Sequence, residues 1–252
     1  MLYPLDHPLL ILVVSLLTFW SSARMGSSLS AIYRSQQNDH RGADFVFVLG
    51  AALNLLGLVI GFTFSMAVSR YDQRKNLEEQ EANAIGTEYV RADLLPAADA
   101  AKVRALLKGY LDQRILYYKA RKQQELREIN AQVARLEAEM WPVVAIPAAA
   151  DPTSVRALSV AGMNDVMNSE GYTQAAWWNR LPIGAWTFLI TLSIFCNLLI
   201  GYAAHRRSAF LLLILPIVLS ISLFLIADID SPRGGVIRVR PQNLERLAES
   251  LH

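Results

Sequence analysis

The chain offers few side chains that could catalyse a reaction or hold a metal. Its four histidines are scattered along the sequence, at His7, His40, His205 and His252. This is not the spacing of a metal site. Asp228 and Asp230 are the remaining metal candidates, but calcium takes about six to eight oxygens, so a cap or an ion pair is the simpler interpretation. Because the sequence also lacks a nucleophile motif, a glycine-rich phosphate loop and a catalytic carboxylate pair, we expect neither an enzyme nor a bound cofactor.

Four side chains on an apolar stretch could instead act on ions in transit. Val59, Phe62, Met66 and Arg70 recur at helical spacing, so they fall in one arc of a helix. In a ring of such helices the apolar residues would form a constriction that gates by losing water, and the arginines would favour anions. The alternative is a surface that faces lipid or packs in a core and ends in an interfacial arginine.

A second arc of the same stretch carries small or polar residues. Its members are Gly50, Asn54, Gly57, Gly61 and Ser65. A Gly-x-x-x-Gly pair lies within it, so close helix packing is the first interpretation. Asn54 is then expected to bond to a neighbouring helix, and a pore-lining stripe is the alternative.

Both arcs belong to the element around which the chain is organised, an uncharged run of 25 residues at 45–69. As a helix this run is roughly 37 Å long, enough to cross a ~30 Å hydrocarbon core with some tilt. Charged residues follow without a proline, so one helix is predicted to continue outside the membrane to Leu95. The i,i+4 spacing of Arg74 and Glu78 predicts a solvated face on this continuation.

Composition and the other apolar blocks indicate an all-α integral membrane protein. Hydrophobic residues make up 53% of the chain and charged residues only 18%, whereas a soluble domain carries about a quarter charged residues. Further apolar blocks at 8–29, 181–204 and 208–227 give four predicted transmembrane helices. The net charge of +2 gives no reason to expect a nucleic-acid partner. Cys196 lies in an apolar run, where a small buried side chain is expected.

The predicted domains follow from these blocks. Residues 1–69 hold the first two membrane helices, 70–180 form a helical extramembrane domain, 181–227 hold the last two membrane helices, and 228–252 form an extramembrane tail. The extramembrane domain is predicted as three helical pieces, which are the continuation to 95, a piece from about 98 to 142, and a piece from 153 to 178 with Thr153 as its cap. A linker or turn is expected at 147–152.

Two shorter patterns concern packing. Apolar residues recur at the a and d positions of a heptad pattern at Leu126, Ile129, Val133, Leu136 and Met140. This seam predicts either packing on a helix of the same chain or an intersubunit coiled coil. The tail is predicted to end in a short amphipathic helix, with Leu244, Leu247, Ala248 and Leu251 on one face.

The membrane orientation rests on the distribution of basic residues. The count covers basic residues near the membrane helices and in the tail. Five arginines belong to the side of the two short loops: Arg24, Arg34, Arg41, Arg206 and Arg207. Eight basic residues belong to the side of the middle domain and tail: Arg70, Arg74, Lys75, Arg180, Arg233, Arg238, Arg240 and Arg246. The positive-inside rule therefore favours a cytoplasmic middle domain and tail. Arg206 and Arg207 in the short hairpin, and the absence of Lys or Arg before the first block, argue the other way.

Several stretches resemble a known family of membrane proteins. Residues 55–72, LLGLVIGFTFSMAVSRYD, are similar to the second membrane helix of the bestrophin anion channels, which lines their pore. A wider pattern resembles the bestrophin-like family of bacterial membrane proteins and spans most of the chain. It comprises EANAIGTEYVRAD at 81–93, D-x-D-x-P at 228–232 and G-x-I at 235–237.

The resemblance implies a chloride-type anion channel in a bacterial inner membrane. It implies a homo-oligomeric ring, with five as the expected number of subunits, whose second helices surround a central axis. The partners would be other copies of the chain, the lipid bilayer and small anions. Gln73, Arg74 and Lys75 stand where bestrophins have Arg-Trp-Trp, and the acidic run of their calcium clasp has no counterpart, so calcium gating is not expected. The alternative is a membrane scaffold or sensor that uses the same oligomer without conducting.

Overall fold

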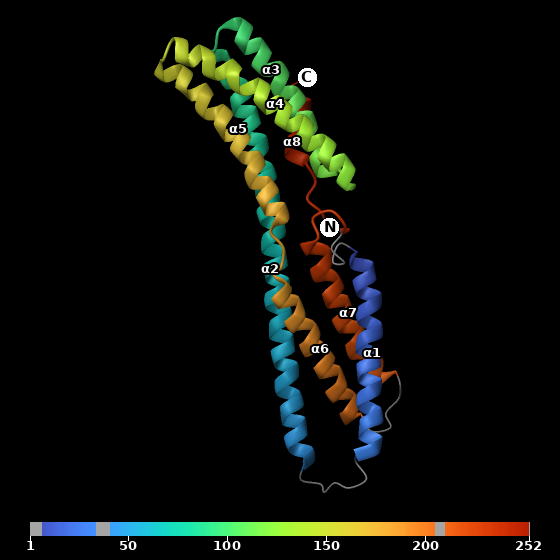
Figure 1. The fold of residues 1–252 in the computed structure, drawn as a ribbon. Coiled ribbons are helices and arrows are strands. Elements are labelled where there is room, and N and C mark those ends of the chain that lie inside the picture. The colour runs from blue at the N-terminus through green and yellow to red at the C-terminus, as the bar shows by residue number, and fades with distance from the viewer. Residues whose placement is uncertain (1–6, 34–40, 205–209, 252) are drawn as a thin grey trace. The chain divides into compact units, whose positions relative to one another are not determined.

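The computed structural model describes residues 7–33, 41–204 and 210–251. Within these ranges the chain forms helices and no strands, which confirms the predicted all-α fold. The elements are α1 (Pro8–Tyr33), α2 (Arg41–Arg91), the short 3-10 helix η3 (Ala92–Leu94), α3 (Ala97–Lys119), α4 (Gln123–Ala150), α5 (Ser154–Trp178), α6 (Ile183–Ala203), α7 (Leu211–Asp230) and α8 (Gln242–Ser250) (Figure 1). The chain divides into two compact units, Met1–Arg70 with Arg180–Arg238 and Tyr71–Asn179 with Val239–His252.

Four helices of the described chain are long and apolar enough to cross a membrane, which confirms the predicted spans. They lie in α1, in α2, in the run that ends with α6, and in α7. The longest helix, α2, has 51 residues, and charged residues follow its uncharged part at 45–69. The predicted hairpin at 205–207 and the histidines at 40, 205 and 252 lie outside the described residues.

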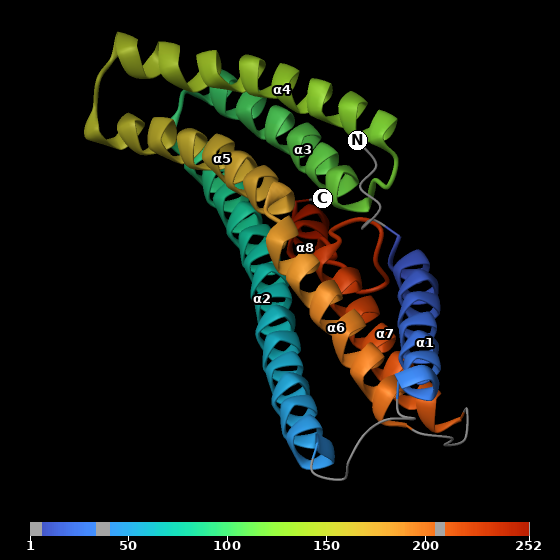
Figure 2. The same ribbon diagram turned by 60° about the horizontal axis from the view of Figure 1, so that its bottom comes forward.

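The first unit is built on close contacts of α1, which packs against both α6 and α7 (Figures 1 and 2). Gly26 on α1 lies directly against the carbonyl of Leu198, and Gly201 on α6 lies directly against the carbonyl of Ala23. A methyl group at either glycine would overlap the backbone of the other helix. Glycine is therefore required at both positions by the distance between the helices. Cys196 is buried, as predicted.

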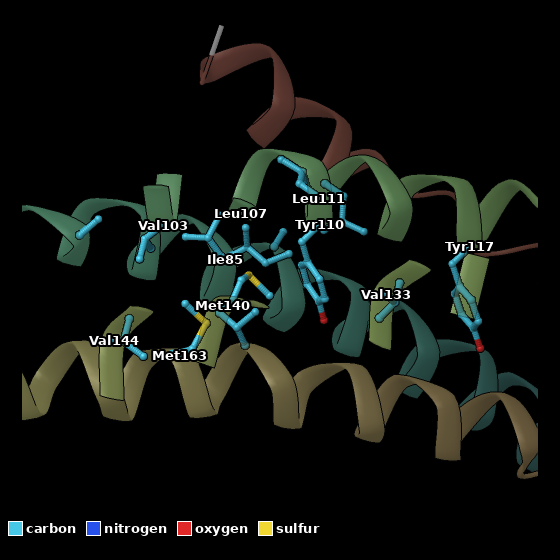
Figure 3. Packing of buried hydrophobic residues seen from close by; sticks show 14 of the residues in the cluster. Ile85, Val103, Leu107, Tyr110, Leu111, Tyr117, Val133, Met140, Val144 and Met163 are labelled. Carbon is cyan, nitrogen blue, oxygen red and sulfur yellow. The ribbon is translucent and has the colours of Figure 1, made fainter. Parts of the chain in front are cut away.

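The second unit combines the continuation of α2 with α3, α4, α5 and α8. Its core is made of apolar side chains from several helices (Figure 3). Ile85 of α2, Leu107 and Tyr110 of α3, Met140 of α4 and Met163 of α5 are all fully buried. Burial of such side chains contributes about 1.5–3 kcal/mol each, so this core fixes the packing of the four helices.

The prediction of one helix from about 98 to 142 is wrong, because α3 and α4 form a hairpin there. The chain leaves α3 at Ala120, which has extended backbone (φ −62°, ψ 137°), and no Gly or Pro marks this break. A single helix would leave its apolar seam without a partner in the chain. The hairpin instead buries Leu126, Val133 and Met140 in the core of the unit, so the seam packs within the chain.

The end of α4 also lies further along the sequence than predicted. The helix continues through Pro142 and Pro147 to Ala150, so the expected linker at 147–152 is mostly helical. A proline inside a helix costs about 3 kcal/mol or more. Burial of Val143 and Val144 directly after the first proline offsets part of that cost. The cap prediction for α5 is confirmed, because the hydroxyl of Thr153 accepts the N–H of Arg156 at 3.2 Å.

The amphipathic tail helix is confirmed. In α8, Leu244 is fully buried, and Leu247, Ala248 and Leu251 pack against the core of the second unit. The predicted apolar face is therefore the face by which the tail is held.

Candidate pore helix and the groups that anchor it

The uncharged part of α2 buries only a narrow stripe of its surface within the chain. Leu56, Thr63 and Ala67 are buried, and they lie on one face at spacings of seven and four residues. Only 6% of the apolar window of α2 is buried, against 50% for that of α7. Most of the surface of this helix is therefore left for lipid, for another subunit or for a pore.

The sequence-predicted lining residues lie on one flank of the buried stripe. Phe62 and Met66 are exposed, with 63% and 42% of their surface accessible, whereas Val59 and Arg70 are half-buried. Arg70 also has an interaction partner within the chain. With roughly 100° per residue, Phe62 lies about 120° from the stripe and Arg70 only about 40° from it.

The small-residue arc lies away from the rest of the chain. A methyl group added at Gly50, Gly57 or Gly61 would meet no atom of the described residues within 4 Å. Asn54 and Ser65 are exposed on the same arc. No described residue of the chain therefore provides the close helix packing that this arc predicts.

Directly after the span, Arg74 joins α2 to the end of α5. Its side chain is 1% exposed, and its guanidinium donates hydrogen bonds to the carbonyls of Ala176 and Asn179, both at 3.3 Å. These carbonyls are at the C-terminus of α5, where the helix dipole favours a cation. Glu78 is equally buried, so the prediction of a solvated face for this pair is wrong. The i,i+4 spacing could not show that α5 and α8 cover this side of α2.

Glu78 holds the start of the tail helix. Its carboxylate accepts the backbone N–H groups of Asn243 and Leu244 at 2.8 and 3.1 Å, and the Asn243 side-chain amide at 2.6 Å. A carboxylate at a helix N-terminus satisfies otherwise unpaired N–H groups and the helix dipole. Burial raises the pKa of Glu78, and these hydrogen bonds oppose the rise.

A buried ionic network links α2, α3 and α5 in the second unit. The guanidinium of Arg114 on α3 forms an ion pair with Glu81 on α2, and both side chains are fully buried. Glu81 also accepts hydrogen bonds from Tyr118 and Thr173, each at 3.1 Å. Glu170 on α5 lies 3.5 Å from Arg114. Removing one partner of such a pair leaves an uncompensated buried charge, which costs about 3–5 kcal/mol.

A third carboxylate, Glu137 on α4, adds negative charge to the surroundings of Arg114. Burial, and then the charge of Glu170, raise the pKa of Glu137 to about 7, while Arg114 opposes the rise. Burial also raises the pKa of Glu170. Tyr110 points its hydroxyl towards α5 (Figure 3), and burial raises its pKa well above the usual value. Around neutral pH the carboxyl group of Glu137 can therefore still gain or lose a proton.

The aspartates proposed as metal candidates bind backbone N–H groups. Asp228 accepts from Val236 and Ile237 at 2.7 and 2.8 Å, and Asp230 accepts from Leu181 at 3.1 Å. Gly235 lies so close to the Asp228 carbonyl that a methyl group would overlap it. These contacts show Asp228 and Asp230 as acceptors of backbone hydrogen bonds. No group of metal-binding side chains occurs within the described part of the chain.

Sequence reasoning missed the roles of Glu81, Arg114 and Glu170. Glu81 was visible only as the first residue of the family-like pattern at 81–93, and Arg114 and Glu170 belong to no motif. No local pattern could have revealed this network, because its three residues lie 33 or more positions apart in sequence and meet only in the folded chain.

The model of the Bestrophin-like domain family matches residues 13–244. The chain belongs to the bestrophin-like family. It is a helical membrane protein of that family, as the resemblance predicts, and no curated protein matches its sequence.

Solved bestrophin-like structures share the fold at low sequence identity. A bacterial bestrophin homolog from Klebsiella pneumoniae is 16% identical with a TM-score of 0.65, and the match covers 96% of this chain and 95% of that one. A variant of the Klebsiella protein with one substitution is 14% identical with a TM-score of 0.69, covering 95% and 93%. A further crystal structure, described as a membrane protein, is 15% identical with a TM-score of 0.66 and covers 97% of each chain.

Proposed function

We propose that this bestrophin-like protein is a homo-oligomeric anion channel in which copies of α2 surround the pore. The observation that carries the proposal is the environment of Asn54. This amide lies near the middle of the uncharged run, is exposed in the single chain, and has no hydrogen-bond partner among the described residues. A polar amide in hydrocarbon costs several kcal/mol without a partner. A neighbouring subunit or a water-filled pore would remove that cost.

The buried stripe of α2 indicates which face would point to the pore axis. With roughly 100° per residue, Asn54, Leu58 and Ser65 lie within about 20° of the side opposite the stripe. Phe62 lies about 60° further round, and is the predicted lining residue nearest to that side. We therefore propose Leu58 and Phe62 for the narrow part of the pore, with Met66 beside them and Val59 towards the subunit contact.

Arg70 would act at the mouth of this pore. It is the first charged residue after the uncharged run, and a ring of copies would place several positive charges at the same depth. Such charges attract anions over a Debye length of ~8 Å at physiological salt, even from a half-buried position. Arg70→Glu is expected to reduce the preference for anions or to reverse it.

Ion flux into liposomes tests the conduction proposal. Replacing Phe62 and Met66 together by Ala removes two bulky apolar side chains, so the pore should hydrate and anion flux should increase. Phe64→Ala is the control on the other flank of the helix, because Phe64 is also exposed but lies about 160° from Phe62 round the helix. Folded, oligomeric protein that gives no flux under any ion gradient would contradict the proposal. An equal increase from the control would contradict the assignment of the pore face.

A non-conducting scaffold or sensor is the second candidate function. The exposed amide of Asn54 supports this function equally, because Asn54 side chains of neighbouring subunits could form hydrogen bonds with each other without a water-filled pore. The two functions share the oligomer and differ only in flux. A chain that forms the oligomer but never conducts would support the scaffold.

We further propose a ring of five subunits in the inner membrane of a bacterium. The middle domain and the tail would lie together on the cytoplasmic side, as the count of basic residues favours. Native mass spectrometry in mild detergent measures the subunit number, and a monomer at micromolar concentration would contradict the ring. Cysteines introduced at Asn130 and Ser250 should be labelled from the same side.

A further inference from the structure

A glutamate outside the membrane span, Glu88, is buried in the second unit without a partner. It lies on the charged continuation of α2, well past the uncharged run at 45–69, and its side chain is fully buried. Neither carboxylate oxygen has a hydrogen-bond partner among the described residues. The ionic network around Arg114 does not include it, and neither does the proposed pore.

The carboxyl group of Glu88 lies against the backbone of α5. Its contact residue is Gly162, where a methyl group would overlap the glutamate oxygen and the guanidinium of Arg91. One turn away, the buried hydroxyl of Ser159 donates a hydrogen bond to the carbonyl of Arg91 at 3.0 Å. Glu88 thus lies between α2 and α5, with its carboxyl group against the backbone of α5 at Gly162, where α5 has no side chain.

A carboxylate in this position would be a buried charge without a hydrogen bond. Such a charge is so unfavourable that the group takes up a proton instead. The charged groups that face Glu88 are Arg91 on its own helix and Asp165 on α5. Burial raises the pKa of Glu88 to about 8, with Arg91 opposing the rise and Asp165 adding to it.

We propose that Glu88 is a proton-binding site that keeps α2 and α5 in contact while it is protonated and weakens this contact when it ionises. The extramembrane unit then responds to alkaline pH. With a pKa of about 8, about a tenth of the sites are ionised at pH 7 and about nine-tenths at pH 9. An ionised Glu88 needs water or an ion pair, and water reaches it only if α5 moves away from α2 at Gly162. This inference concerns the extramembrane unit and does not depend on conduction.

Infrared spectroscopy of the full-length protein in detergent tests the site directly. A protonated carboxyl group has a C=O stretching band that a carboxylate lacks. One component of this band should disappear with a midpoint near pH 8, apart from the component of Glu137, which should disappear near pH 7. Glu88→Gln should lack the component near pH 8, and Glu79→Gln, at an exposed position of the same helix, should retain it. A component near pH 8 that persists in Glu88→Gln would overturn the proposal.

Two further variants identify the titrating group through its neighbours. Asp165→Asn removes a negative charge from an exposed position, so it should fold normally and lower the midpoint. Arg91→Gln removes a positive charge and should raise it. Midpoints that fail to move in these opposite directions would overturn the assignment, even if Glu88→Gln did not fold.

Hydrogen exchange tests the coupling to helix packing. Amides of α5 at 154–178 should exchange at least about tenfold faster at pH 9 than at pH 7, after correction for the intrinsic rate. Glu88→Gln should abolish this acceleration, because its side chain remains neutral. Equal acceleration in the variant and the wild type would refute the coupling.

Discussion

Glu137→Gln should make the protein more stable at neutral and alkaline pH while leaving its stability in acid unchanged. Glu137 on α4 is half-buried and faces Glu170, Arg114 and Tyr110. In the folded protein its pKa is raised from 4.5 to about 7, first by burial and then by the charge of Glu170. Glutamine is close to the protonated glutamate in size and shape, but it cannot ionise.

The sign and size of the stability change follow from the difference between the pKa of Glu137 in the folded and in the unfolded protein. A raised folded-state pKa contributes stability that is fully present below pH 4.5 and is lost as the pH rises through about 7. At ~1.4 kcal/mol per pKa unit, the loss is at most about 3 kcal/mol, because solvent screens a half-buried group. For a unit of about 120 residues this corresponds to a change in melting temperature of up to about 10 °C.

Thermal unfolding of full-length protein, measured from pH 4 to pH 9, gives the required comparison. Trp177 is a suitable reporter for this unit, because it is buried and its ring lies 5.5 Å from that of Tyr118. The difference between Glu137→Gln and wild type should open between pH 4.5 and pH 7 and stay constant above. The exposed Glu139→Gln is the control on the same helix. A difference that is the same at pH 5 and pH 8.5 would refute the reasoning.

Three further predictions concern close contacts and the tail. Gly162→Ala should lower the melting temperature, because the added methyl group overlaps the buried side chain of Glu88 and that of Arg91 at a cost of about 1–3 kcal/mol. Gly171→Ala in the same helix should instead stabilise the protein by about 0.5–1 kcal/mol, because Gly171 has open space around it. Gly201→Ala should destabilise the membrane unit in the same way, whereas Gly184→Ala should be tolerated; equal melting temperatures within either pair would contradict the packing. Glu78→Ala should accelerate hydrogen exchange in α8 by at least about tenfold, since it removes charged hydrogen bonds worth about 1.5–3 kcal/mol each, and unchanged exchange would show that the tail is held in another way.

The membrane helices were predictable because a single physical requirement determines them. An uncharged run such as 45–69 has to be a helix in lipid, where each backbone group must find a partner within the segment. The sequence of this run did not indicate which face of α2 packs against other helices of the same chain. That face depends on Leu56, Thr63 and Ala67, which differ little in type from their neighbours.

In the second unit the sequence signals were weaker. The break between α3 and α4 has no Gly or Pro, and Ala120 leaves the helix only because the hairpin buries the seam of α4. Pro142 gave the opposite error, because it predicted a helix end where the helix continues. Residues on both sides of this proline, Met140 and Val143, are buried in the core and hold the helix together. In each case long-range burial outweighed a local preference.

The buried charges show the same limit. Arg74 and Glu78 have the spacing of a surface pair, and only the positions of α5 and α8 reveal that each binds the end of another helix. By contrast, the backbone N–H groups that Asp228 accepts lie only eight and nine residues further along the chain. Local hydrogen bonds can be inferred from a motif, whereas partners a hundred residues away cannot.

The contact between Gly26 and Leu198 has a consequence for biosynthesis. The first helix leaves the ribosome early, but the residue on which it packs is synthesised about 170 positions later. Until then α1 must remain in the bilayer without its native partner, together with α2. A chain interrupted before α6 should therefore insert its first two helices and yet remain unassembled, open to degradation or to pairing with a neighbouring nascent chain.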